Sequence, residues 1–395
     1  MAGGFLKYKQ GVKKNWIAVA TFFFFCIYYL ILLYSHIDTD IQAHAFVSYK
    51  FITEGGALTP NFLYFITIAF FAGFSKYKFM YYAASVFIIS LSLTAKYLIN
   101  TFYTVKYSLA NTGLNKQVFF TAASLMFIFC LPGLNFFEQG DFLLGQLASN
   151  VWHNSTVIFL FPFAIVLFFQ LFGFIQNFER KKIPFLIFLI VINALIKPSF
   201  LFTIMPTVML WGVIIKNKNY RKILITLSAL TILALALIFL QYFVIYIPVQ
   251  SGSALPCKDC TDGVSIEPFA VWKYYSLSIP VSFASSLFFP FLYFVISKGS
   301  VLKDSLVKFA AINWLISLLI YIVFIETGGR KYHGNFGWQM IIGNYLLFFV
   351  LAIQLFNNAD EKKSKTYKTL SLAFLLHILW GIIYFLKIIF LKNYF

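Results

Sequence analysis

Long apolar runs separated by short polar segments fill most of this 395-residue chain. An α-helix needs roughly 20 residues to cross a membrane, and most runs approach that length. They lack the weak alternation, over roughly ten residues, that is typical of an outer-membrane barrel. The pattern therefore predicts an all-α, polytopic transmembrane helical bundle that forms a single integral membrane domain, 1–395. The expected spans are 16–35, 60–74, 79–103, 117–135, 156–176, 183–196, 199–215, 223–247, 277–297, 309–325, 340–356 and 370–391.

The distribution of charge assigns the two sides of this bundle. The chain carries a net charge of +18, and many of its Lys and Arg residues stand in short clusters at 7–14, 76–78, 180–182, 216–222, 298–308 and 362–368. Along most of the chain these clusters alternate with acidic loops, as the positive-inside rule requires for cytoplasmic flanks. Membrane topology thus explains the charge, and no nucleic-acid partner is expected. The outer loops are then about 36–58, 136–155, 248–276 and 326–339.

The alternation does not close between residues 60 and 135. One of the runs 60–74, 79–103 and 117–135 must be re-entrant, interfacial or broken. The short 60–74 run and the Pro132-Gly133 pair are candidate causes. We expect about 11–12 membrane segments, with eleven crossings and one re-entrant piece preferred.

The first outer loop contains an expected helix and a candidate base. Apolar positions from 41 to 52 recur at helical spacing, which predicts a short amphipathic helix at the membrane surface that ends before Gly55-Gly56. Asp38, Asp40 and His44 form the first constellation, with Asp40 and His44 on one helical face. A partly desolvated carboxylate suits a general base. Alternatively, the two aspartates only cap the helix.

The second constellation lies in mid-chain, at the start of the 156–176 run. Its polar and aromatic side chains are Gln146, Asn150, Trp152, His153 and Asn154. Trp152 and His153 are suited to stack on a sugar or to pair with a phosphate. In the alternative interpretation, Asn154 or Ser155 is an ordinary N-cap and Trp152 is an interfacial anchor.

The third constellation is Arg330, Lys331, His333 and Asn335, which follow Glu326. Basic residues on the outer side run against the positive-inside rule, and an arginine fork fits a phosphate. An ion pair between Glu326 and Arg330 that only staples the loop is the alternative. Lys197, also on the outer side, either snorkels or adds to a phosphate site.

The cysteines divide into two pairs. Cys26 and Cys130 lie in apolar runs and are expected to be small core residues. Cys257 and Cys260 form a CKDC sequence in an outer loop, where a disulfide between them is our first choice and no role at all is the alternative. A single CxxC is weak evidence for zinc.

Three sequence motifs resemble bacterial multi-spanning proteins of the GT-C glycosyltransferase superfamily. They are Asp40-Ile-Gln-Ala-His44, Gly-Gln-Leu-Ala-Ser-Asn-Val-Trp-His-Asn-Ser-Thr in mid-chain, and His-Gly-Asn-Phe-Gly-Trp near the end. The plan of many helices with outer loops closing over a groove is similar along nearly the whole chain. No large soluble carboxy-terminal domain is evident here, which makes a protein acceptor less expected than a lipid or glycan.

The resemblance implies a membrane glycosyltransferase in the bacterial inner membrane, with its active site facing the periplasm or cell exterior. Its donor would be a polyprenyl-phosphate sugar, and its acceptor a membrane lipid or an envelope glycan. The family's base maps to Asp40, with Asp38 as the fallback, and its phosphate-binding residue maps to Arg330, with Lys331 or His333. A divalent metal, Mg or Mn, is possible at Asp38, Asp40 and His44, although their spacing is not diagnostic.

Two other functions stay open at this stage. A transporter or flippase of lipid-linked sugars would place ionisable residues near the bilayer midplane and would show inverted repeats. An O-antigen-type polysaccharide polymerase would depend on several arginines in a large outer loop, whereas Arg330 is the one arginine expected outside.

Overall fold

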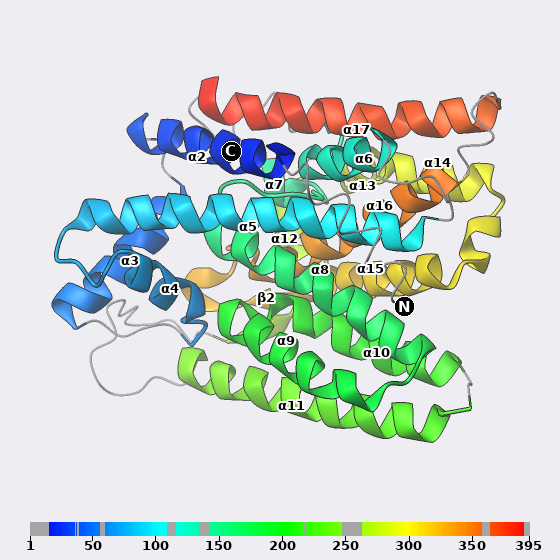
Figure 1. Ribbon diagram of the computed structural model, residues 1–395, viewed down its shortest axis with the longest axis horizontal. Helices are drawn as coiled ribbons and strands as arrows, with labels where there is room; N and C mark the ends of the chain where they lie inside the picture. Colours follow the sequence, from blue (N-terminus) through cyan, green and yellow to red (C-terminus); the bar gives the residue numbers. More distant parts are fainter. Residues whose placement is uncertain are drawn as a thin grey trace.

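Apolar helices that run roughly along one axis form most of the molecule (Figure 1). The computed structural model describes residues 16–35, 37, 39–55, 60–108, 116–133, 142–215, 218–246, 263–357 and 364–390. The helices are α2 (Trp16–Tyr34), α3 (Asp40–Glu54), α4 (Leu63–Phe71), α5 (Lys78–Tyr107), α6 (Lys116–Phe127), α7 (Phe142–Gly145), α8 (Ser155–Gln176), α9 (Ile183–Ile196), α10 (Leu201–Ile214), α11 (Tyr220–Tyr246), α12 (Ala270–Tyr275), α13 (Ile279–Ser286), α14 (Phe288–Ile296), α15 (Ser305–Val323), α16 (Trp338–Asn357) and α17 (Lys365–Phe390). Short 3-10 turns are η2 (Arg180–Lys182), η3 (Pro198–Phe200), η4 (Ser300–Lys303), η5 (Gly328–Arg330) and η6 (Asn335–Gly337).

Among the described residues, seven helices are long and apolar enough to cross a membrane, or eight if the bent pair α13 and α14 is one span. Helix α11 shows the character of a lipid-facing helix, because Ile225, Ile232 and Phe239 are 71%, 67% and 57% exposed. Such exposure of large apolar side chains is costly in water and favourable in lipid. The prediction of an all-α, multi-pass membrane protein is confirmed.

Five of the twelve expected spans are shorter or bent, so seven or eight helices meet the length test instead of about 11–12. Helices α4, α6, α9 and α10 have 9, 12, 14 and 14 residues. The 277–297 run is divided into α13 and α14, which meet at an angle of 69°. Helices α4, α9 and α10 and the α13–α14 pair start and end within about three residues of the expected ranges, whereas α6 ends eight residues before the expected end of the 117–135 run.

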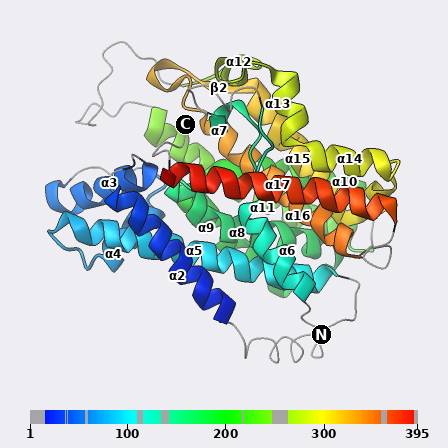
Figure 2. The same ribbon diagram turned by 90° about the horizontal axis from the view of Figure 1, so that it is seen from above.

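The break expected between residues 60 and 135 lies in α4 and α6, while α5 is continuous over 30 residues. Helix α4 starts and ends at one end of the bundle, beside α3, as both views show (Figures 1 and 2). Before it, Asn61 donates to the Ile196 carbonyl at 3.4 Å; after it, the Lys78 ammonium lies 4.3 Å from the Phe46 ring centre. We call this end the α3 end.

Lys78 corrects one part of the charge assignment. The 76–78 cluster was grouped with the cytoplasmic flanks, opposite the first acidic loop, yet Lys78 lies against Phe46 of α3 in that loop. Helix α5 then runs to the opposite end of the bundle, where the Tyr107 carbonyl accepts a hydrogen bond from Asn357 at 3.3 Å. The chain therefore returns to the α3 end through α4 without crossing.

Helix α6 stops at Phe127, before the Pro132-Gly133 pair. Residues Ile128, Phe129 and Cys130 are not helical but fully buried. Helix α17 packs directly on this point: a Cβ atom at Gly381 would lie 1.6 Å from the Phe127 carbonyl oxygen. A glycine is required there for the close backbone approach.

One small sheet, which the apolar pattern did not predict, joins two of the polar loops. Strands β1 (Val264–Ile266) and β2 (Phe324–Glu326) pair antiparallel, with Val264 opposite Glu326 and Ile266 opposite Phe324. The pairing continues in a hydrogen bond from the Thr327 N–H to the Gly263 carbonyl at 2.9 Å. It fixes the start of the loop that carries the third constellation.

Candidate functional site

The helix expected in the first acidic loop is α3, and Asp40 is its first residue. Thr39 is the N-cap, and its N–H donates to the side-chain oxygen of Gln42 at 3.2 Å. Thr39, not Asp40, is the cap, so the Asp40 carboxylate is not used to start the helix. The helix ends at Gly55, with φ of 68°, as the sequence predicted.

Asp40 and His44 both meet the start of α8, one turn apart on α3. The Asn154 amide donates to Asp40 Oδ2 at 2.5 Å, and His44 Nδ1 lies 2.7 Å from Ser155 Oγ. Asn154 is the N-cap of α8, because its Oδ1 accepts from the Val157 N–H at 3.0 Å. The cap fixes the amide group, so its nitrogen is directed at the carboxylate. The first and second constellations therefore come together.

Lys197 lies beside this contact, at the break between α9 and η3. Its backbone is extended (φ −169°, ψ 115°), as expected for a residue that precedes a proline. Its ammonium lies 3.4 Å from Thr156 Oγ1 and 4.5 Å from the Trp338 ring centre. Burial lowers the pKa of Lys197 from 10.5 to about 8, while the charges of Asp40 and Glu326 raise it. A partly buried cation thus lies within the electrostatic reach of two carboxylates from different segments, Asp40 and Glu326.

The third constellation reaches the same place through Asn335 and Trp338. Asn335 donates to Glu326 Oε2 at 2.5 Å and accepts from the Trp338 indole N–H at 3.1 Å. Gly334 turns the loop with φ of 66°, and a Cβ there would lie 2.6 Å from a methyl group of Leu144. The loop is therefore closed over the mid-chain segment, and Trp338 is presented to Lys197.

The two histidines of this region have imidazoles that stay neutral near pH 7. Burial, with a further contribution from the charge of Lys197, lowers the pKa of both His44 and His153 from 6.5 to about 3. The His153 ring lies 6.3 Å from the Trp338 ring. Both can therefore donate and accept hydrogen bonds, while Lys197 provides the positive charge. We call Asp40, His44, Asn154, Lys197 and Trp338 the α3-end cluster.

Gln146, Asn150 and Trp152 lie elsewhere, because the described part of the 136–155 loop is packed inside the bundle and is not an exposed loop. Gln146 bonds the hydroxyl groups of Ser282, Ser285 and Ser286 of α13. The segment is rich in backbone groups that helices do not satisfy, and buried polar side chains supply the missing partners.

Asn150 and Trp152 likewise contact protein groups. The Asn150 amide donates to the carbonyls of Leu125, Met126 and Ile128 at 3.0–3.3 Å. Trp152 is 1% exposed, and its ring packs against those of Phe129, Tyr384 and Phe385. In this structure three residues of the mid-chain constellation, Gln146, Asn150 and Trp152, form a scaffold that holds the segment inside the bundle. The segment joins the cluster only at residues 153–156.

The basic residues of the third constellation are not drawn into the cluster. Lys331 forms an ion pair with Glu267 at 2.8 Å, and this hydrogen bond raises its pKa. Arg330 is partly exposed and His333 is exposed. The ion pairs found between described residues do not include the alternative Glu326–Arg330 staple.

Three predicted residues, Asp38, Cys257 and Cys260, lie outside the described residues, so the fallback base and the disulfide stay predictions. Within the described residues no group of three His, Cys, Asp or Glu side chains could hold a metal ion. Asp40 and His44 are two of the three expected Mg or Mn ligands, and both are engaged with Asn154 and Ser155. Because Lys197 already supplies positive charge beside Asp40, we assign no step to a metal.

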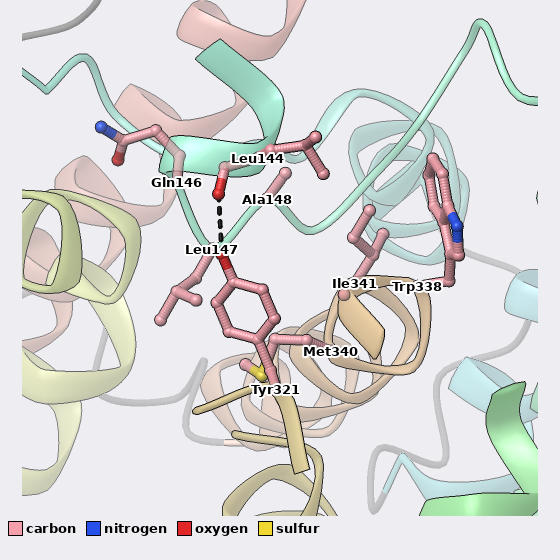
Figure 3. A pocket seen from close by; sticks show the side chains of 9 residues that line it. Leu144, Gln146, Leu147, Ala148, Tyr321, Trp338, Met340 and Ile341 are labelled. Carbon is pink, nitrogen blue, oxygen red and sulfur yellow. Dashed lines mark hydrogen bonds between the residues drawn. The ribbon is translucent and has the colours of Figure 1, made fainter. Parts of the chain in front are cut away.

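A pocket lies beside Trp338, the first residue of α16 (Figure 3). It is small, with a cavity volume of about 10 Å³, and lies between the mid-chain segment, α15 and α16. Apart from Gln146, Tyr321 and Trp338, its lining is aliphatic, methionine or glycine. Tyr321 closes one wall by donating to the Leu144 carbonyl at 2.7 Å. Trp338 is thus shared by a charged cluster and an apolar pocket.

Comparison with known proteins gives no match to any family model, curated protein or solved structure. Function therefore has to be argued from the cluster itself. The sequence pattern did not single out Lys197, the cation of this cluster, as a main site residue. The sequence feature that could have indicated it is a Lys-Pro pair between two apolar runs, at a point where the chain is expected to turn back.

Proposed function

We propose that this protein is a membrane glycosyltransferase of the GT-C type that uses a polyprenyl-phosphate sugar as donor. The observation that carries the proposal is the Asp40 carboxylate, held by Asn154 near the partly buried Lys197 at one end of a helical bundle. A base and a cation side by side are what displacement of a phosphate from a sugar requires.

In the proposed reaction an acceptor hydroxyl oxygen attacks the anomeric carbon of the donor. Its proton passes to the Asp40 carboxylate as the new C–O bond forms. The bond between the anomeric carbon and the phosphate oxygen breaks at the same time, and polyprenyl phosphate leaves with both electrons. Lys197 stabilises the phosphate as its charge grows, and the displacement inverts the anomeric centre.

Lys197 replaces Arg330 as the first choice for the phosphate-binding cation. It is partly buried near the base, where its charge is screened less than on an exposed loop. Arg330, partly exposed on the loop above, remains suited to the approaching donor. The acceptor, a lipid or an envelope glycan, would enter at the α3 end, which we assign to the outer face of a bacterial inner membrane.

A transporter of lipid-linked sugars is the second candidate, because a lysine, an ionisable residue, lies inside the bundle. Lys96 of α5 is 1% exposed, and buried intramembrane charges commonly mark transport pathways. Measuring both sugar transfer and the movement of lipid-linked sugar between leaflets separates the two functions. A polysaccharide polymerase would depend on several arginines in an outer loop. The loop 326–339 contains one, Arg330, so the polymerase alternative gains no support.

The test supplies membranes containing wild type or Asp40→Asn with a polyprenyl-phosphate sugar and follows transfer of labelled sugar. We expect turnover in the wild type and a loss of about 100-fold or more in Asp40→Asn, which keeps the contact with Asn154 but removes the base. Glu54→Gln, on the far end of α3, is the matched control and should keep full activity. Full activity of Asp40→Asn would exclude this base. Movement of the lipid-linked sugar between leaflets without transfer would favour the transporter.

A further inference from the structure

Lys96 occupies a closed cage in the interior of the bundle. Its Nζ lies 2.5 Å from Asn150 Oδ1 and 3.7 Å and 4.0 Å from the ring centres of Phe161 and Tyr345. These partners come from the mid-chain segment, α8 and α16. An amide oxygen and two aromatic faces are groups that stabilise an ammonium away from water.

Asn150 connects this cage to the end of α6. Its Oδ1 accepts from Lys96, while its Nδ2 donates to three carbonyls at the helix end, those of Leu125, Met126 and Ile128. A helix carries partial negative charge at its carboxyl end, so the donating amide nitrogen of Asn150 faces a matching partner. One side chain thereby fixes a non-helical segment to α5 and α6.

The same segment carries the group that holds the proposed base. Asn154 follows Asn150 by four residues and donates to Asp40. The intervening Trp152 carbonyl accepts from the Tyr29 hydroxyl at 3.0 Å, so the stretch between the two asparagines is restrained. The path from residue 150 to the cluster is therefore short and held by hydrogen bonds at both ends and in its middle.

We propose that Lys96 is a positioning residue of the candidate site, which acts through Asn150 and the mid-chain segment on Asp40. The inference rests on the proposed function for its effect on activity, but the structural coupling stands on its own. It also gives Lys96 a fixed role: with an amide oxygen and two rings around its nitrogen, it is held in place, whereas a transport pathway needs a charge that changes partners.

A native cysteine reports on the coupling without any assay of activity. Cys130 is fully buried, two residues beyond the Ile128 carbonyl that Asn150 holds. In a chain whose other cysteines are changed to alanine, Cys130 should react slowly with a maleimide. We expect Lys96→Met to raise the rate of labelling about tenfold or more, because the 128–133 segment opens locally more often.

The matched control is Lys106→Met in the same helix. Lys106 also lies near two aromatic rings, those of Tyr103 and Tyr107, but it is exposed. The Lys106→Met variant should leave Cys130 labelling and sugar transfer unchanged. Phe161→Leu removes one face of the cage and keeps the lysine, so we expect a smaller increase in Cys130 labelling. It serves as the second variant if Lys96→Met does not fold.

Activity then tests positioning. Per folded molecule, Lys96→Met should lower kcat for sugar transfer by about 100-fold with little change in donor KM, as expected for a misplaced base. Lys96→Arg should restore part of it. Unchanged labelling of Cys130 in both Lys96→Met and Phe161→Leu would overturn the coupling. Increased labelling with an unchanged kcat would overturn the positioning role. If the wild type shows no transfer, the proposed function fails, while the labelling result still decides the coupling.

Discussion

Two polar segments take opposite places in this molecule. The mid-chain segment 144–155 has three amide side chains, and the loop 326–338 has three charged residues and four glycines. Each contains a tryptophan, and both are expected from the sequence to be outer loops. The first is buried almost throughout, and Gln146 and Asn150 bond protein groups. The second is turned outward at Arg330 and His333. A polar cluster in a membrane chain can thus be an internal scaffold or an accessible surface, and the partners of its side chains distinguish the two.

Among substitutions in the two segments, we expect the largest loss of stability at Asn150. Asn150→Ala removes four hydrogen bonds of the scaffold, including one from Lys96, and should lower the free energy of unfolding by about 3 kcal/mol or more. Arg330→Ala, on the exposed segment, should change it by less than about 0.5 kcal/mol. Unfolding in detergent, followed by circular dichroism, measures both. Equal effects would mean that the two segments do not differ as described.

The contact between the two segments should respond to a glycine substitution. Gly334→Ala combines a left-handed backbone with a clash against Leu144, and should destabilise by about 2–3 kcal/mol. Gly299→Ala has a similar φ of 73° but open space around its Cβ, so it isolates the backbone strain, about 1–2 kcal/mol. Thermal unfolding compares the pair. A Gly334→Ala effect no larger than that of Gly299→Ala would show that the loop does not press on the mid-chain segment.

The pH dependence of sugar transfer sharpens the role of the cluster where the segments meet. Lys197 is charged below its pKa of about 8 and loses its proton above it, so kcat/KM should fall as pH rises, approaching tenfold per unit. Lys197→Arg should remain active at higher pH, since an arginine stays protonated. No separate loss near pH 6 is expected from His44, whose pKa is about 3. A profile that is identical in Lys197→Arg would remove Lys197 from the mechanism.

Much of the fold could be predicted from the hydrophobic pattern, and the exceptions have physical causes. Helices α2, α5 and α8 follow the expected runs because a helix satisfies its own backbone groups in lipid. The same rule misplaced residues 142–155, the described part of the expected outer loop 136–155. Polar, non-helical backbone is excluded from lipid but is allowed inside a bundle that provides partners. Hydropathy cannot distinguish such a segment from an outer loop.

The site was anticipated in part. The i,i+4 spacing of Asp40 and His44 and the N-cap signal of Asn154 are local, and the structure bears out both arrangements. The position of Lys197 depends on how α9 and α10 pack, a long-range property that no local pattern contains. For the same reason Lys331 could not be assigned to its partner Glu267, which is brought close by strand pairing.

In the proposed mechanism, Lys197 and Asp40 form one site for a phosphate-linked substrate. The most direct measurement is the affinity of the purified protein, in lipid nanodiscs, for polyprenyl phosphate, the proposed leaving group. Lys197→Met should weaken binding roughly tenfold to 100-fold, the loss expected for one charge-assisted contact. Lys106→Met, a lysine substitution at the opposite end, should not change it. Equal affinity in Lys197→Met and the wild type would contradict the claim.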